Sequence, residues 1–135
     1  MLPMRQLKTY IVEDSLVIRD NLIATLEEIS PVKVVGVADE ESTAVQWLNQ
    51  PENPVDLVII DIFLKTGSGL GVIKAGACLA PRPKLVVLSN YATQDMRGKC
   101  LQLGADEVFD KSHDIEGLIE YCNDLVVGDD AGTLP

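Results

Sequence analysis

The sequence predicts an α/β protein, a doubly wound parallel sheet of five strands with five helices. Five short apolar runs alternate with five amphipathic stretches of helix length, which is typical of βαβ units built on a parallel sheet. Two of the runs, VDLVII and KLVVL, are almost continuously apolar, as expected of strands that are covered on both faces. The length of 135 residues fits one domain with a single core.

The first two strands are predicted at residues 7–12 and 32–38, which are rich in apolar and β-branched side chains. Between them, residues 15–29 carry apolar side chains at nearly helical spacing, and the pattern stops before Pro31. A short second helix is predicted at residues 40–50, where the proline-rich segment PENP ends it.

The third strand is predicted at residues 55–60 and the third helix at residues 69–80, before two closely spaced prolines. The fourth strand, at residues 84–88, leads to a helix at residues 92–103 with one apolar stripe. Gly104 follows as the expected stop of that helix, because glycine accepts the backbone conformation of a helix end.

The last strand and helix are predicted at residues 107–109 and 113–126, and this helix also has one apolar stripe. No internal repeat or linker divides the chain, so residues 1–126 are predicted to form one domain. The tail at residues 127–135 is expected to be disordered, because it has few side chains that could pack.

Charge and composition exclude several classes of function. The chain has 21 acidic and 11 basic residues, a net charge of -10, which disfavours direct binding to nucleic acid or to a membrane. No apolar run approaches the ~20 residues that cross a bilayer, and no secretory signal is evident, so we expect a cytoplasmic protein. The three cysteines lack the spacing of a disulfide framework or a zinc site.

Polar side chains follow four of the predicted strands, at the point where each strand ends. Glu13 and Asp14 follow the first strand, and Asp61 follows the third. Ser89 follows the fourth strand, and Lys111 comes just after the fifth. Because the carboxyl ends of parallel strands lie along one edge of the sheet, where ligands bind, we expect these side chains to meet there.

Three carboxylates at one edge repel each other, and a divalent cation would offset that repulsion. Mg²⁺ prefers oxygen ligands and commonly binds through one or two carboxylates together with phosphate oxygens. An aspartate can attack phosphorus to form an acyl phosphate, whose oxygens a cation, an ammonium and a hydroxyl would neutralise. Each residue also has an ordinary explanation: Asp14 could cap the following helix, and Lys111 could lie in solvent.

Four motifs carry a resemblance to a known family. They are an acidic pair, a phosphoacceptor segment, a hydroxyl and a lysine: Glu13-Asp14, Asp61 in VDLVIIDIFLKTGSGL, Ser89 in LVVLSN and Lys111 in GADEVFDKS. Their order and spacing resemble the receiver domain of bacterial two-component response regulators, and the resemblance covers about residues 6–126.

The resemblance implies a flavodoxin-like strand order, 2-1-3-4-5, and a site for Mg²⁺ or Mn²⁺. Its metal ligands would be Asp14, Asp61 and the backbone carbonyl of Phe63, with Glu13 assisting through water. It also implies transfer of a phosphoryl group to Asp61 from a histidine kinase or a histidine phosphotransfer protein, with Lys111 at the same site.

The resemblance further implies a switch. Phosphorylation would draw Ser89 inward and repack the face formed by the fourth helix, the fifth strand and the fifth helix. That face would bind a downstream protein target or a second copy of the chain, giving a homodimer. The strand position that commonly holds the switch aromatic is Val108 here, and the neighbouring Phe109 is expected to point to the opposite face of the sheet.

Other positions near the site depart from the usual pattern of the family. Ser112 follows Lys111 where proline is usual, and a trans bond is expected because a cis bond before serine costs ~2.5–4 kcal/mol. Asn90 replaces a smaller residue and could narrow access to Asp61. Tyr91 could shield the site from water or could pack at the start of the fourth helix.

The first functional hypothesis is a stand-alone receiver that has no turnover on a free substrate. A receiver domain cut from a longer transcriptional regulator would have the same sequence features. A hydrolase of the haloacid dehalogenase type needs a second aspartate two residues after the nucleophile, where this chain has Phe63, which cannot transfer protons. A nucleotide-binding module would need a glycine-rich phosphate loop after a strand, and the sequence has none.

Overall fold

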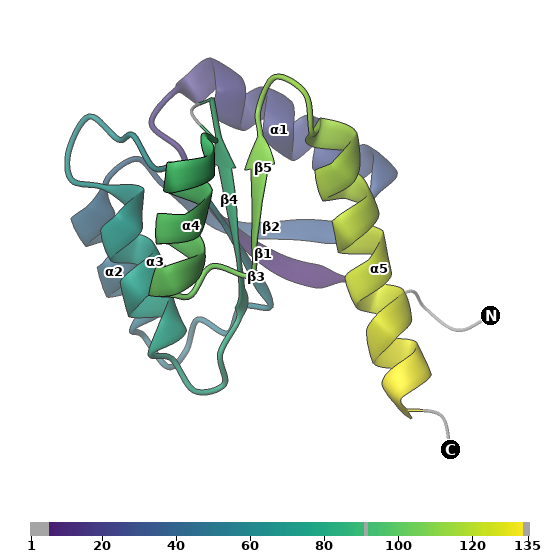
Figure 1. The fold of residues 1–135 in the computed structure, drawn as a ribbon. Helices are drawn as coiled ribbons and strands as arrows, with labels where there is room; N and C mark the ends of the chain where they lie inside the picture. The colour runs from purple at the N-terminus through teal and green to yellow at the C-terminus, as the bar shows by residue number, and fades with distance from the viewer. Residues whose placement is uncertain (1–5, 91, 134–135) are drawn as a thin grey trace.

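The computed structural model describes residues 6–90 and 92–133. Within them, strands and helices alternate in the predicted order (Figure 1). The strands are β1 (Leu7–Val12), β2 (Val32–Ala38), β3 (Leu57–Ile60), β4 (Lys84–Ser89) and β5 (Glu107–Asp110). The helices are α1 (Leu16–Ile29), α2 (Glu41–Leu48), α3 (Gly69–Ala77), α4 (Gln94–Leu103) and α5 (Ile115–Thr133).

The five strands of the described chain form one parallel sheet in the order β2-β1-β3-β4-β5. This is the doubly wound, flavodoxin-like order, so the predicted fold class is confirmed. Val12 pairs with Ile60, and Ile60 pairs with Val87, so the three central strands reach the same level. Ser89 pairs with Asp110 two residues further along β4. The residues that follow these strands therefore meet at one edge of the sheet.

Helices cover both faces of the sheet, and alternate residues of each strand point to the two faces. In β3, Val58 and Ile60 belong to the core under α2, α3 and α4, whereas Leu57 and Ile59 belong to the core under α1 and α5. Figure 1 shows α2, α3 and α4 together on one side of the sheet and α5 on the other. Both faces of β3 are therefore buried, which explains its uninterrupted apolar sequence.

In β5, the alternation of side chains places the two apolar residues on opposite faces of the sheet. Val108 is buried in the core under α2, α3 and α4. Phe109 packs in the opposite core, where its ring meets Tyr121 edge to face with the ring centroids 5.9 Å apart. The prediction that the two residues point to opposite faces is confirmed.

The peptide bond between Lys111 and Ser112 is trans, as predicted.

Two helix ends differ clearly from the prediction. α3 ends at Ala77 rather than at residue 80, and α5 continues to Thr133, so the predicted helix end at residue 126 is wrong. The domain limit at residue 126 and the disorder expected for residues 127–135 are not tested by a helical backbone alone and stay predictions. No helix in the described part of the chain combines the length and the apolar character needed to span a bilayer.

Candidate functional site

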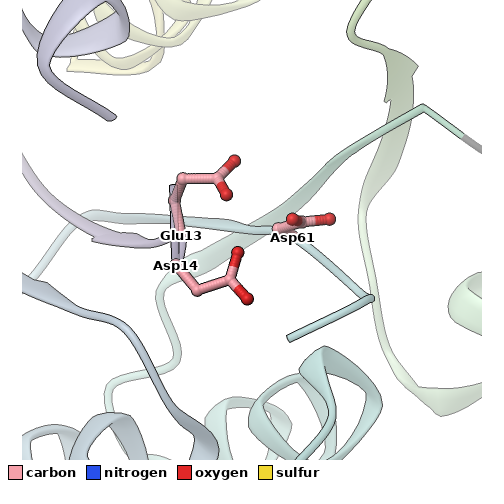
Figure 2. A group of neighbouring side chains, drawn as sticks. All are labelled: Glu13, Asp14 and Asp61. Carbon is pink, nitrogen blue, oxygen red and sulfur yellow. The ribbon is translucent and has the colours of Figure 1, made fainter. Parts of the chain in front are cut away.

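The polar residues that follow the strands do meet at one edge of the sheet. In the described chain, Glu13, Asp14 and Asp61 each offer a carboxylate oxygen, and these oxygens lie within 4.8 Å of one another. Figure 2 shows the three carboxyl groups gathered around a common space. Lys111 reaches the same group from the loop after β5, and Ser89 lies fully buried at the end of β4. The predicted gathering of Glu13, Asp14, Asp61 and Lys111 is therefore present, and Ser89 lies on the strand that ends at the same edge.

Backbone hydrogen bonds hold the site residues in register just beyond the strands. The N–H of Asp61 donates to the carbonyl of Val12 at 2.9 Å, which continues the pairing of β1 and β3 by one step. The N–H of Lys111 donates to the carbonyl of Ser89 at 3.1 Å and does the same for β4 and β5. The backbones of Asp61 and Lys111 are thus positioned by the sheet itself.

Lys111 joins two of the three carboxylates. Its Nζ donates to Oε1 of Glu13 and to Oδ2 of Asp61, with the latter contact at 3.2 Å. The group is largely hidden from water, since Glu13 is 3% exposed and Asp61 is 8% exposed. Buried charges persist only where they are paired, so this ammonium makes the burial of the two carboxylates tolerable.

Lys111 offsets only part of the effect of burial on the pKa of Asp61. The pKa of Asp61 is raised to about 6 overall: burial raises it most, the Lys111 ammonium lowers it, and the nearby charge of Glu13 raises it. Burial alone would lower the pKa of Lys111, but its hydrogen bond to Glu13 and the charge of Asp61 raise this pKa overall. A perturbed carboxyl group beside a specific charged partner is typical of functional sites.

Asp14 is held by the backbone of a different segment. Ser15, and not Asp14, caps α1: its hydroxyl oxygen accepts from the N–H of Ile18 at 3.4 Å. Oδ2 of Asp14 accepts from the N–H of Lys65 at 2.7 Å, in the loop between β3 and α3. The alternative that Asp14 only caps the first helix is therefore wrong, and its carboxylate faces the acidic group.

The loop after Asp61 runs close to the site and needs a glycine. The N–H of Phe63 donates to Oδ1 of Asp61 at 3.4 Å, while the residue as a whole is 51% exposed. The N–H of Gly69 donates to the carbonyl of Ile62 at 2.9 Å, which brings the start of α3 against the backbone of Asp61. A Cβ atom at Gly69 would lie 2.1 Å from the carbonyl oxygen of Asp61, so no side chain fits there.

A shallow hollow of about 190 Å³ opens over the acidic group. The residues that line it come from five segments and are Glu13, Asp14, Ser15, Ile18, Asp61, Phe63, Asn90 and Lys111. Asn90 therefore borders the hollow, as its predicted effect on access requires. Val108 is not among these lining residues, and Tyr91 lies outside the described residues.

The donor set suits a hard divalent cation. Three carboxylates and one ammonium leave an excess of negative charge, and their oxygens lie close enough to share one ion. Mg²⁺ and similar cations prefer such oxygen ligands, whereas the site has no histidine or cysteine among its three clustered groups. Sequence reasoning missed the Lys65 N–H that orients Asp14, because a backbone donor leaves no trace in residue types.

The comparisons with known proteins agree on one family. The family model of the response regulator receiver domain matches residues 9–123. A probable transcriptional regulatory protein of Picosynechococcus is 33% identical over 121 residues, which are 86% of this chain and 47% of the relative. The chain spans between 31% and 59% of the length of three curated relatives that it matches.

Solved structures share the fold. The receiver domain of the Francisella response regulator 1452 has a TM-score of 0.79 at 21% identity, covering 92% of this chain and 99% of that one. A response regulator protein of Burkholderia pseudomallei, described with a phosphorylated aspartic acid, a calcium ion and citrate, has a TM-score of 0.72 at 21% identity. That likeness covers 95% of this chain and 75% of the Burkholderia chain.

Proposed function

Because the chain belongs to the receiver domain family of two-component response regulators, we propose that it accepts a phosphoryl group on Asp61 from a phosphohistidine donor. The observation that carries this proposal is the placement of Asp61. Its buried carboxylate lies beside Lys111 and two further carboxylates at the floor of an open hollow. This arrangement places a nucleophile, the Lys111 ammonium and a route of entry for the phosphodonor in one place.

The nucleophile in this chemistry is the ionised form of Asp61. With a pKa of about 6, this carboxyl group is mostly ionised at neutral pH. One of its oxygens attacks the phosphorus of the donor, an O–P bond forms and the P–N bond breaks. The electron pair of that bond leaves with the imidazole nitrogen, and an acyl phosphate remains on Asp61. The proposal does not include catalytic turnover on a free substrate.

Mg²⁺ or Mn²⁺ would be held by Asp14, Asp61 and the backbone carbonyl of Phe63, with Glu13 assisting through water. When bound, the cation would neutralise charge on the phosphoryl oxygens. The close grouping of the three carboxylates supports this assignment. The Burkholderia relative, which is described with a phosphorylated aspartic acid and a calcium ion, offers a parallel for the same combination of groups.

Lys111 and Ser89 would contact the transferred group. The Lys111 ammonium already lies 3.2 Å from Oδ2 of Asp61, so it can follow the added charge with little movement. Ser89 would turn toward the phosphoryl oxygens and thereby affect Val108 and the α4–β5–α5 face. Partners would be a histidine kinase or histidine phosphotransfer protein on the input side, and a downstream protein or a second copy on the output side.

The side chain two residues after Asp61 argues against a hydrolase of the haloacid dehalogenase type. Phe63 stands at that position; the residue is 51% exposed, and its side chain carries no group that transfers protons. Asn90, at the rim of the hollow, would restrict which donors reach Asp61. The shielding of the site from water by Tyr91 stays a prediction from the sequence.

The test is intact-mass measurement after incubation with acetyl phosphate, with and without Mg²⁺. The wild-type chain should gain one phosphoryl group only when Mg²⁺ is present. Asp61→Asn should gain none, while Asp124→Asn, which removes an exposed carboxylate from α5, should behave as wild type. Acid-labile phosphate retained by the Asp61 variant would refute the assignment of the acceptor.

A further inference from the structure

Glu41 connects α2 to the loop that borders the acidic site. Its backbone N–H donates to the carbonyl of Thr66 at 3.3 Å, and its Oε1 accepts from the N–H of Ser68 at 2.8 Å. Both partners lie in the segment between β3 and α3 (residues 61–68), which we name the acceptor loop. Glu41 therefore holds this loop at two points that are two residues apart.

The opposite side of the acceptor loop contacts the acidic site. The N–H of Lys65 donates to Oδ2 of Asp14 at 2.7 Å, and the N–H of Phe63 donates to Oδ1 of Asp61 at 3.4 Å. Thr66, which Glu41 holds, is the next residue after Lys65. A displacement of the loop at Thr66 would thus move the donor that orients the Asp14 carboxylate.

Glycines allow Glu41 to approach the loop closely. Gly67 has a φ of +81°, and a Cβ atom built there would lie 2.5 Å from the Cβ of Glu41. A Cβ atom at Gly71, in the first turn of α3, would lie 2.2 Å from Oε2 of Glu41. The half-buried Glu41 side chain therefore fits between the loop and α3, which Figure 1 shows beside α2.

In the described chain, the hydrogen bonds of the neighbouring Glu40 side chain are all local. Its Oε1 accepts from the hydroxyls of Ser42 and Thr43, at 2.9 and 3.2 Å, within the start of α2. Glu40 and Glu41 thus carry the same charge at the same helix end, but only the second reaches the acceptor loop. This contrast provides a matched control.

We propose that Glu41 is a positioning residue for the acidic site, acting through the acceptor loop on the carboxylates of Asp14 and Asp61. The proposal rests on the proposed function, since it concerns the metal affinity of that site. A charge-assisted hydrogen bond from a backbone N–H to a carboxylate is strong enough to hold a short loop in one place. Groups that orient metal ligands commonly change the metal affinity by about tenfold or more when removed.

The test compares Glu41→Ala, Glu41→Gln, Glu40→Ala and wild type in the full chain. Amide hydrogen exchange by NMR, without added metal, reports directly on the Lys65 and Ser68 N–H groups. Calorimetric titration with Mg²⁺ reports the affinity, and phosphorylation by acetyl phosphate over a range of Mg²⁺ concentrations separates the half-saturating concentration from the maximal rate.

We expect Glu41→Ala to speed exchange at both amides and to weaken Mg²⁺ binding by about tenfold, with an unchanged rate at saturating Mg²⁺. Glu41→Gln keeps an oxygen that can accept from Ser68 and should recover much of the affinity. Glu40→Ala should match wild type in both measurements. If Glu41→Ala does not fold, the same comparison is made between Glu41→Gln, with a smaller expected loss, and Glu40→Gln.

Failure of the two proposals would look different. Wild type that binds no Mg²⁺ would overturn the proposed metal site and this inference with it. Wild type that binds Mg²⁺, with equal affinity in the Glu41 variants, would overturn this inference alone. Faster amide exchange without a change in affinity would also overturn it, because Glu41 would then support the loop without positioning the carboxylates.

Discussion

Replacing Asp61 by asparagine should change how the stability of the metal-free protein depends on pH. Asp61 is 8% exposed, and its pKa is raised from 3.8 to about 6, chiefly by burial. The folded state therefore disfavours the ionised carboxylate relative to the unfolded chain. A shift of about two pH units corresponds to roughly 3 kcal/mol of free energy of unfolding. Asparagine keeps the shape of the side chain but never ionises.

The sign follows from comparing the two states. Below pH 3.8 the carboxyl group is protonated in the folded and in the unfolded chain, so it causes no pH dependence there. Between pH 3.8 and about 6 the unfolded chain loses the proton while the folded chain retains it, and stability falls as the pH rises. Above this range the full loss of roughly 3 kcal/mol is present in wild type and absent from Asp61→Asn.

Urea unfolding in the presence of a chelator, at pH values from 4 to 8, measures this difference. The stability of Asp61→Asn relative to wild type should rise by roughly 2–3 kcal/mol between pH 4 and pH 7. Asp124→Asn removes the same charge from an exposed position on α5 and should show no such rise. Parallel pH profiles for wild type and Asp61→Asn would refute the argument that a strained, buried carboxylate occupies this site.

Two further predictions follow from neighbouring residues. Lys111→Met should raise the pKa of Asp61 above about 6, because the ammonium lowers it, and a carboxyl-carbon NMR titration that shows no rise would contradict this. Gly69→Ala should destabilise the fold by about 2 kcal/mol or more in urea unfolding, because the new Cβ would lie 2.1 Å from the Asp61 carbonyl oxygen. Gly98→Ala in α4 is its control, since a Cβ there meets nothing within 4 Å and should be neutral or stabilising.

The gathering of the acidic site could be predicted because it depends on topology rather than on side-chain detail. Continuous apolar runs such as that containing Ile59 and Ile60 require a strand with two covered faces, and these residues do pack in opposite cores. Parallel strands then bring their carboxyl ends to one edge, whatever the exact strand limits are. Asp61 and Lys111 therefore meet although 50 residues separate them in the sequence.

Other features depend on packing that no periodicity reveals. The backbone of α5 continues to Thr133, through two glycines that favour an earlier end, so local composition alone misplaced the end of this helix. The role of Glu41 depends on how closely α2 approaches the acceptor loop, and that distance is set by Gly67 and Gly71. The sequence shows these glycines but not which side chain fills the space that they leave.

The charges at the site explain why a fold would keep such a costly group of residues. Lys111 is shared between Glu13 and Asp61, whereas Asp14 has a backbone N–H as its partner. One ammonium cannot balance three carboxylates, so the metal-free site is less stable than a neutral core would be. Under the proposed function, a divalent cation between Asp14 and Asp61 would supply the missing charge. The instability of the empty site is then the reason for its affinity, because binding relieves a repulsion that folding has already imposed.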